Sequence, residues 1–351
     1  MTTALAIAVA VLAVSALIVI HEAGHFLAAR RFGMRVERFS VGFGPVLLSF
    51  RRGETEFAIS ALPLGGYVKI AGMSPGDDVA EGDRSAYANQ AAWRRFLVIL
   101  AGPFMNYLTA IFIAAGLLAT LGLRAPDPSA TVGLVVEGAP AAQAGLLPGD
   151  RIVSVDGAPV DSFAALVREF QRRPGQTVPL EIERGAGAAA ERLTLTITPR
   201  DEGGVGRVGV RQGHVSERRG AAAAIAEGFT RTNAQAGLQL AAFGALFSGG
   251  SKAELSGPAG IAQELVRGAR AGTEPFLSLV WVISIVLAIL NLLPVPALDG
   301  GRLVFLLWEI VTRRRVNERV ENAFHLAGFV ALVALILAVT IFGDLPKILG
   351  R

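Results

Sequence analysis

The chain has 351 residues, of which 52% are hydrophobic and 18% are charged, and this composition excludes an ordinary soluble globular protein and favours a membrane protein. It contains no cysteine, which excludes disulfides, thiolate metal sites and cysteine nucleophiles, so any bound metal must use His, Asp or Glu. The net charge of +4 does not indicate a nucleic-acid partner, because the arginines lie at the ends of apolar segments and along an intervening domain.

Four apolar segments are long enough to cross a bilayer, and each must be helical because lipid offers no partner to a free backbone group. We therefore predict a polytopic α-helical membrane protein with four transmembrane helices, a membrane-associated β-region and an inserted extracytoplasmic α+β domain. The apolar segments are 4–31, 96–121, 276–298 and 323–342. The expected parts are a first span at 1–32, a cytoplasmic-side β-region and acidic loop at 33–92, a second span at 93–122, a folded domain at 128–212, an amphipathic linker at 213–272, a third span at 273–301, a loop at 302–322, a fourth span at 323–343 and a tail at 344–351.

The first apolar segment ends in VIHEAGHFLAARR, residues 19–31. It lacks the basic leading region of a secretory signal, so we interpret it as an uncleaved helix. His21 and His25 are four residues apart, about 400° of helical rotation, so both imidazoles lie on one face and can bind one metal ion. Glu22, beside them, can take a proton from a metal-bound water and later pass it to the leaving amine. The bland alternative is a helix that ends in polar interfacial residues.

The distribution of arginine predicts the orientation in the membrane. Arginines cluster at 30–52, after the first span, and at 313–319, between the third and fourth spans, so both loops should be cytoplasmic. The two termini and the region 122–272 then lie on the outer side. Arg30 follows His25 by five residues, which puts the histidines roughly 7 Å inside the cytoplasmic edge of the membrane.

Residues 36–72 form short β-rich runs interrupted by glycine and proline. We expect a small sheet of hairpins that dips into the membrane edge or packs against the helices. The following segment, 74–90, is acidic and rich in small residues, which is typical of a cytoplasmic loop.

Residues 130–212 alternate strand patterns with one helical pattern and predict a separate domain of about 80 residues. Within it, GAPAAQAGLLPGDRIVSVDGAPV (138–160) resembles the PDZ family. A PDZ fold binds an extended peptide as an added strand at an open sheet edge. The alternative is that the domain acts only as a spacer or a steric lid. The segment 218–250 that follows can form a helix on the membrane surface.

The third apolar segment runs into NLLPVPALDGGR, residues 291–302. Its two prolines break the helical hydrogen-bond ladder at membrane depth, which is tolerated only where protein or a water-filled cavity surrounds the chain. Asp299 would cost about 2.5 to 3.5 kcal/mol in lipid unless it is paired, and a metal cation is an efficient partner. DGG alone is usually a turn, but beside HEAGH it makes Asp299 the best candidate for a third ligand. Glu37, His325 and Glu309 are weaker candidates.

Together these motifs resemble the site-2 protease family of intramembrane zinc metallopeptidases, and specifically its bacterial regulator-of-sigma-E protease branch. HEAGH and LDG in separate spans are the most specific part. One departure is that well-studied members carry two tandem PDZ domains, whereas this chain has room for one. The matching segments are HEAGH, VGFGP (41–45), AGPFMN (101–106), the PDZ-like region, LSGPAGIAQ (255–263) and NLLPVPALDGG (291–301).

The resemblance implies that Zn²⁺ is held by His21, His25 and Asp299, with Glu22 as the general base. The reaction it implies is hydrolysis of a peptide bond within a transmembrane segment of a single-span membrane protein. Anti-sigma factors and remnant signal peptides are the substrate classes of the family, and the bacterial plasma (inner) membrane is the expected location.

The resemblance also assigns residues that contact substrate. Asn291 occupies the position that contacts the substrate backbone near the scissile bond. Gly42, Phe43 and Gly44 match a GFG segment that helps to present substrate. Two other functions remain open from the sequence: a membrane-anchored HExxH peptidase that cuts soluble proteins at the cytoplasmic face, and a membrane scaffold whose polar residues are structural.

Overall fold

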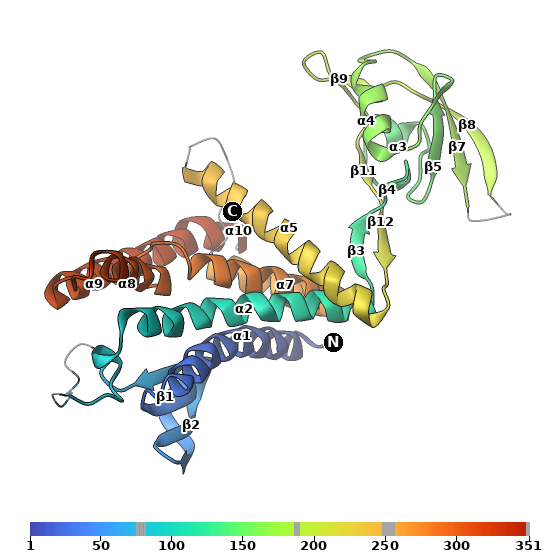
Figure 1. The fold of residues 1–351 in the computed structure, drawn as a ribbon. Helices are drawn as coiled ribbons and strands as arrows, with labels where there is room; N and C mark the ends of the chain where they lie inside the picture. The colour runs from blue at the N-terminus through green and yellow to red at the C-terminus, as the bar shows by residue number, and fades with distance from the viewer. Residues whose placement is uncertain (75–76, 78–79, 81, 186–189, 248–256, 349–351) are drawn as a thin grey trace. The chain divides into compact units, whose positions relative to one another are not determined.

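The computed structural model describes residues 1–74, 77, 80, 82–185, 190–247 and 257–348. Parts of the predicted acidic loop, the linker residues 248–256 with the first two residues of the LSGPAG motif, and residues 349–351 of the predicted tail lie outside this description. The chain divides into two compact units (Figure 1). Unit 1 comprises Met1–Leu121 and Arg219–Arg351, and unit 2 comprises Gly122–Arg218.

Unit 1 is mainly helical. Within the described residues, four helical stretches are long and apolar enough to cross a membrane. They are Thr3–Arg31, Ala92–Ala119, Thr273–Leu290 and Arg319–Asp344. The helices of the unit are α1 (Thr3–Arg31), α2 (Ala92–Ala119), α5 (Ala221–Phe247), α6 (Pro258–Ala271), α7 (Thr273–Leu290), α8 (Asp299–Thr312), α9 (Glu318–Ala338), the π-helical turn η3 (Val339–Asp344) and α10 (Leu345–Ile348); the short 3₁₀ helix η1 (Tyr87–Asn89) precedes α2.

The third of these helices is shorter than the apolar segment 276–298 suggests. Helix α7 ends at Leu290, and the chain is not helical again until Asp299 begins α8. The break contains Pro294 and Pro296, each of which lacks the N–H that a helix needs. The structure therefore agrees with the predicted unwinding, and it separates α7 from the helix that carries Asp299.

Helix α2 is the central element of unit 1 and contacts α1, α5, α7 and α8. Helices α1 and α2 approach closely at Gly24, where an added Cβ would come within 2.2 Å of the Ala101 carbonyl oxygen. At the cytoplasmic-side end expected from the sequence, α2 and α8 are joined by a largely buried ion pair of 2.5 Å between Arg95 and Glu309. Because both α1 and α8 pack on α2, this helix determines how they are placed relative to each other.

The predicted β-region is a hairpin of two long, bent strands, β1 (Val36–Arg52) and β2 (Thr55–Ile70), beside α1 (Figure 1). Its register shifts let the first part of β1 pair with both ends of β2, so the hairpin forms four adjacent segments. Their order is 46–52, 55–60, 36–41 and 66–70. Segment 66–70 is thus a sheet edge, and β2 packs on α1.

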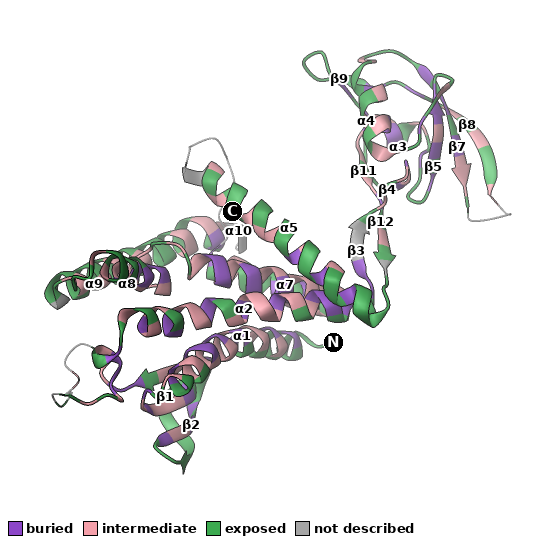
Figure 2. Cartoon of the chain, viewed as in Figure 1, coloured by how far each residue is buried: buried purple, intermediate pink, exposed green. Residues whose placement is uncertain are grey.

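Unit 2 contains a four-stranded antiparallel sheet in the order β6-β5-β7-β8 and a core of its own. This core includes Ile152, Leu166 and Leu180. Figure 2 draws the buried parts of the chain in purple. The unit extends beyond the expected 128–212 because β3 pairs with β12. Its elements are β3 (Leu123–Pro126), β4 (Val132–Val135), α3 (Pro140–Gln143), β5 (Arg151–Val155), β6 (Ala158–Pro159), α4 (Phe163–Gln171), β7 (Val178–Arg184), β8 (Glu191–Ile197), β9 (Arg200–Asp201), β10 (Gly206–Arg207), β11 (Val210–Gln212) and β12 (His214–Glu217).

Candidate metal centre

Three potential ligand atoms, from helices α1 and α8 of unit 1, lie close together. The Nε2 atoms of His21 and His25, on α1, are 3.2 Å apart. The Oδ2 atom of Asp299, at the first position of α8, lies 3.0 Å from His21 Nε2 and 3.3 Å from His25 Nε2. Both histidines are buried, and Asp299 is largely enclosed. The helical spacing of HEAGH thus places both imidazoles on the face that meets Asp299, 274 residues later in the chain.

These atoms fit a zinc ion. Tetrahedral zinc with bonds of about 2.0 to 2.1 Å holds its ligand atoms roughly 3.3 to 3.4 Å from one another. The three observed separations, 3.0, 3.2 and 3.3 Å, are close to that spacing. Asp299 Oδ2 is buried and has no hydrogen-bond partner among the described residues, as expected for an atom placed to bind a cation. Imidazole nitrogen and carboxylate oxygen are also ligand types that zinc accepts.

Helix α2 supplies one wall of this group through the segment AGPFMN (101–106). An added Cβ at Gly102 would lie 2.4 Å from His25 Nε2 and 2.8 Å from His21 Nε2, so only glycine leaves this space open. The Nδ1 atom of His25 donates a hydrogen bond of 2.8 Å to the Val98 carbonyl, which leaves Nε2 free to bind a metal. On the other imidazole, His21 Nδ1 lies 3.3 Å from the Asn106 side-chain amide.

The non-helical segment 291–298 folds back over the first turn of α8 and so fixes the position of Asp299. An added Cβ at Gly300 would come within 1.8 Å of the Leu293 carbonyl oxygen, which explains why glycine follows the aspartate. Ala297 has a left-handed φ of 71°, an uncommon conformation for a residue with a side chain. Its N–H donates to His325 Nδ1 on α9 at 3.2 Å. His325 therefore supports the segment that presents Asp299 and is not one of the three converging residues.

Glu22 is held by the sheet. Its carboxylate accepts a hydrogen bond of 3.1 Å from the backbone N–H of Val68, in the edge segment of β2. Ser15 on the same helix donates to the Pro63 carbonyl, so β2 follows α1 from Pro63 to Val68. The hairpin thus lies directly beside the glutamate that precedes the metal group.

The predicted substrate-contacting residues lie in the hairpin, close to its edge segment 66–70, or at the end of α7. Asn291 is the C-terminal capping residue of α7, and its side-chain amide donates 3.0 Å to the Leu287 carbonyl. Gly42 and Gly44 have φ values of +88° and +84°, which favour glycine, and they lie where β1 changes its pairing. The Phe43 ring between them stacks on Tyr67, with centroids 6.0 Å apart. Glu37 and Glu309 do not join the metal group, since they pair with Lys69 and Arg95, respectively.

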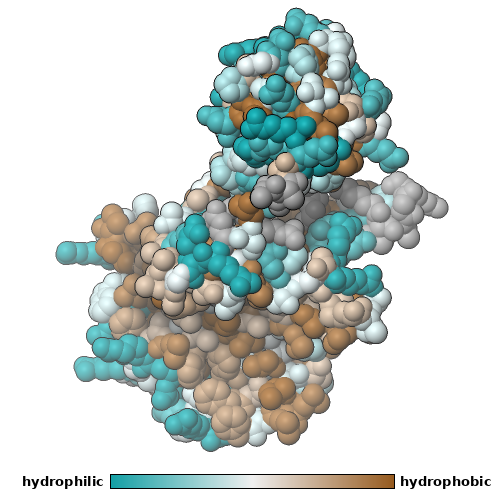
Figure 3. All heavy atoms as spheres, turned by 90° about the vertical axis from the view of Figure 1, so that its right-hand side faces the viewer, coloured by the Kyte–Doolittle hydropathy of each residue, from teal (hydrophilic) through white to brown (hydrophobic). Residues whose placement is uncertain are grey.

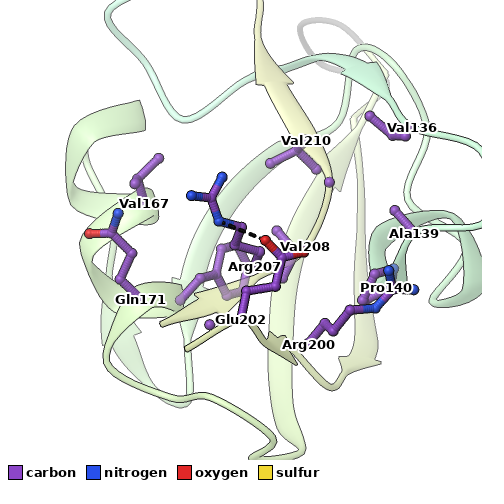
Figure 4. A pocket seen from close by; sticks show the side chains of 13 residues that line it. Val136, Ala139, Pro140, Val167, Gln171, Arg200, Glu202, Arg207, Val208 and Val210 are labelled. Atoms are coloured by element: carbon purple, nitrogen blue, oxygen red, sulfur yellow. Dashed lines mark ion pairs between the residues drawn. The ribbon is translucent and has the colours of Figure 1, made fainter. Parts of the chain in front are cut away.

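Unit 2 contains a separate cavity of about 400 Å³ between α4 and the strands β9 to β11 (Figure 4). Apolar side chains from both sides enter it, among them Val167 and Val210. Arg200 also lines it, and an ion pair of 3.0 Å joins Arg207 to Glu202. The sequence did not identify this cavity, because its strand side comes from the last part of the unit, outside the segment 138–160 that resembles PDZ domains.

The sequence interpretation also missed three residues around the metal group: Gly102, Asn106 and Val68. The first two lie in AGPFMN, a segment noted only for its resemblance and given no role. Their spacing of four residues in a helix was an available signal, since it places both on one face of α2. Val68 contributes only a backbone N–H, and no side-chain pattern marks such a contact.

Comparison with known proteins gives a match over most of the chain. Residues 9–335 match peptidase family M50. A protein of Clostridium perfringens, named as an inferred zinc metalloprotease, is 34% identical over 95% of this chain and 96% of its own length. A protein of Rickettsia conorii with the same kind of name is 33% identical over 93% of this chain and 95% of its own length.

Solved structures similar to part of the chain include two PDZ domains from SdrC-like proteins. The one from Listeria innocua is 26% identical, covers 26% of this chain and 100% of that domain, and has a TM-score of 0.21. The one from Listeria monocytogenes is 24% identical, covers 25% of this chain and 90% of that domain, and has the same TM-score of 0.21.

Proposed function

The chain belongs to peptidase family M50, the site-2 protease family of zinc metalloproteases, and from this membership we propose that it hydrolyses peptide bonds within transmembrane segments of single-span membrane proteins. The observation that carries the proposal is the convergence of His21, His25 and Asp299. Two of the three come from a helix apolar enough to cross a membrane, and the third follows the end of another. A hydrolytic site built from such helices is suited to substrates that are themselves in the membrane.

In this proposal, His21, His25 and Asp299 are the protein ligands of Zn²⁺. A bound zinc ion would act as a Lewis acid on the scissile carbonyl and would lower the pKa of water, which makes water easier to deprotonate. Gly102 keeps the space between the imidazoles and α2 open, and the Val98 carbonyl keeps His25 in the tautomer that offers Nε2.

Glu22 is the proposed general base. It takes a proton from the attacking water and returns it to the nitrogen of the leaving amine. The hydrogen bond from the Val68 N–H fixes one carboxylate oxygen, Oε2, so the side chain has a defined orientation before substrate arrives. That contact also couples the base to the edge of the sheet.

A helical substrate must unwind before its carbonyl can be attacked, because its backbone is already hydrogen-bonded internally. We propose that the unwound segment is presented along the hairpin edge beside Glu22, where strand pairing satisfies the released backbone groups. Gly42, Phe43 and Gly44 belong to the same hairpin, and Asn291 is proposed to contact the extended chain near the scissile bond. The support for this step is the position of segment 66–70, which is an edge of the sheet and touches the base.

The surface of unit 1 supports a membrane location. Apolar side chains, drawn as brown spheres, cover much of the face of this unit that Figure 3 shows. The hairpin also exposes large apolar side chains along its strands, which favours insertion of this apolar surface into the membrane edge. These residues are Val41, Phe43, Val46, Leu47, Leu48, Phe50, Ile59 and Leu62. We propose the bacterial inner membrane, with both termini and unit 2 outside the cytoplasm and the metal group near the cytoplasmic side.

Unit 2 is proposed to select substrates. The cavity beside α4 and β11 combines apolar walls with charged groups, as a groove for an extended peptide requires. Anti-sigma-factor-like proteins and remnant signal peptides are the proposed substrate classes. The competing proposal is that unit 2 only blocks substrates with large outer domains. Substitutions of Val167 and Val210 distinguish the two proposals. If a peptide docks in the cavity, cleavage should be impaired, whereas a steric lid predicts unchanged cleavage.

The experiment that tests the function compares the intact protein with Asp299→Ala and Glu22→Gln. The intact protein should contain near-stoichiometric zinc and cut a tagged single-span substrate within its transmembrane segment. Asp299→Ala should lose zinc and activity together. Glu22→Gln should retain zinc but cut at least roughly 100-fold more slowly, because only the proton transfer is removed.

Each other outcome contradicts a defined part of the proposal. Zinc retained by Asp299→Ala would favour a peptidase that uses HEAGH alone at the membrane face. A wild-type protein without zinc would favour a scaffold. Equal cleavage by wild type and Glu22→Gln would show that Glu22 is not the base.

A further inference from the structure

Asn106 lies on α2 with its side chain almost completely enclosed, at 1% exposure. Its side-chain nitrogen, Nδ2, is 3.3 Å from His21 Nδ1. The side-chain oxygen, Oδ1, has no hydrogen-bond partner among the described residues. The backbone here is fixed independently, because Ser284 on α7 donates a hydrogen bond of 2.7 Å to the Asn106 carbonyl. Buried polar groups in folded proteins are almost always hydrogen-bonded, so the unpartnered Oδ1 needs an explanation.

The two ring nitrogens of His21 have different tasks. Nε2 faces His25 and Asp299, so it is the atom available to a metal. A neutral imidazole that binds metal through Nε2 carries its proton on Nδ1, and that N–H needs an acceptor. An amide nitrogen cannot accept this proton, whereas an amide oxygen can.

We infer that Asn106 is a positioning residue for His21, whose amide, turned by about 180° about its Cβ–Cγ bond, accepts the Nδ1 proton through Oδ1. This rests on the proposed function, since it requires that His21 binds zinc through Nε2. Either orientation of the amide leaves one of its two ends without a protein partner. Only the turned orientation gives the Nδ1 proton an acceptor, and it is therefore the one that a bound metal selects.

Asn106 thus does for His21 what the Val98 carbonyl does for His25. Both acceptors come from α2, two turns of helix apart, with Gly102 midway between them. The face of α2 that includes 98, 102 and 106 therefore orients both imidazoles and leaves room for the ion. This gives the AGPFMN segment a role in the site that its sequence alone does not state.

Two substitutions separate the hydrogen bond from simple packing. Asn106→Leu keeps the approximate size of the side chain but removes the acceptor. Asn106→Asp keeps an acceptor and removes the donor, so it should preserve the orientation of His21. Asn233→Leu is the matched control, because Asn233 on α5 accepts a hydrogen bond from Tyr107 at an exposed position.

The measurements use the full-length protein in detergent. Zinc affinity is measured by competition with a chromogenic chelator, and the cobalt-substituted protein is examined by visible absorption, which reports the ligand field. We expect Asn106→Leu to weaken zinc binding roughly 10- to 100-fold and to shift the cobalt spectrum. Asn106→Asp and Asn233→Leu should stay within roughly threefold of wild type, which is small beside that loss.

Several results would overturn the inference. Unchanged zinc affinity and an unchanged cobalt spectrum in Asn106→Leu would show that the amide does not orient His21, while an active, zinc-containing wild type would leave the proposed function intact. Equal losses in Asn106→Asp and Asn106→Leu would show that side-chain fit, and not the acceptor, matters. If Asn106→Leu does not fold, Asn106→Ala with Asn106→Asp as the rescue gives the same comparison. A wild type that binds neither metal would instead contradict the proposed function.

Discussion

Gly102 leaves the space beside the candidate metal ligands open because it has no side chain. It lies against both imidazoles, and a single methyl group there would occupy the space beside their Nε2 atoms. Gly116, on the same helix, has no atom within 4 Å of an added Cβ. The two glycines therefore differ in what surrounds them and not in the helix that carries them.

Gly102→Ala should lower zinc affinity at least roughly tenfold without unfolding the protein, because alanine favours the helix but its methyl group displaces the histidines. Metal analysis and circular dichroism of the purified protein measure the two effects. Gly116→Ala should bind zinc as the wild type does. Normal zinc content in Gly102→Ala would show that α2 can move away from α1 at this point.

Asp150 in unit 2 gives a prediction about pH. Its carboxylate is buried, and burial by itself raises the pKa, but two hydrogen bonds of 2.8 Å from Arg184 and one from the Leu147 N–H outweigh this effect and lower the pKa below its ordinary value of 3.8. Because the folded state binds the proton more weakly than the unfolded state, the ion pair stabilises unit 2 above pH 3.8. This stability is lost as the pH falls from there through the lower pKa of the folded state.

Asp150→Asn should therefore destabilise unit 2 by roughly 1.5 to 3 kcal/mol at pH 7, and the difference from wild type should shrink as the pH falls below 3.8. Hydrogen exchange of residues 150–184 in the full-length protein measures this. A difference that stays constant from pH 7 to pH 3 would contradict the assignment to the carboxylate.

Among the elements, α9 supports the unwound segment that precedes Asp299, although its own surface is largely exposed and apolar. Most of its described residues are exposed (Figure 2). Two of its residues, His325 and Gly328, nevertheless lie against the unwound segment before α8. His325 accepts the hydrogen bond from Ala297, and an added Cβ at Gly328 would come within 1.8 Å of Pro296. Helix α9 therefore supports the segment that precedes Asp299.

Gly328→Val should displace the 291–298 segment and so reduce zinc binding and cleavage, although residue 328 lies on a different helix from every proposed ligand. Gly237→Val on α5 is the control, because an added Cβ at Gly237 has no neighbour within 4 Å. Zinc titration of both variants provides the comparison. Equal zinc affinity in the two would mean that α9 does not determine the position of Asp299.

The four long apolar helices, the break after α7 and the grouping of HEAGH with Asp299 were predictable because each depends on local pattern and on the cost of polar groups in lipid. The contacts of Asn106, Gly102 and Val68 were not, because they arise where α1, α2 and β2 pack together. The same holds for the four-segment pairing of the hairpin. Hydrophobic periodicity predicts which face of an element is covered, but it does not specify which neighbouring residue covers it.

The whole molecule has a testable orientation, and the absence of cysteine makes the test simple. Single substitutions, Arg192→Cys in unit 2 and Arg314→Cys in the loop between α8 and α9, each place one thiol at an exposed position. In intact cells, a membrane-impermeant maleimide should label the protein with the first substitution and not the second. Both should be labelled after permeabilisation, and labelling of position 314 in intact cells would invert the proposed topology.

The distance along the chain between the two parts of the metal group has a consequence for biosynthesis. At about 5 to 20 residues per second, a ribosome needs roughly 15 to 55 seconds to extend the chain from His25 to Asp299. During that interval HEAGH is complete, whereas the proposed third ligand has not yet been made. Zinc held by two imidazoles alone is short of the three protein ligands of a catalytic site. With the proposed ligand set, the order of the chain therefore delays a complete metal site until Asp299 has been synthesised.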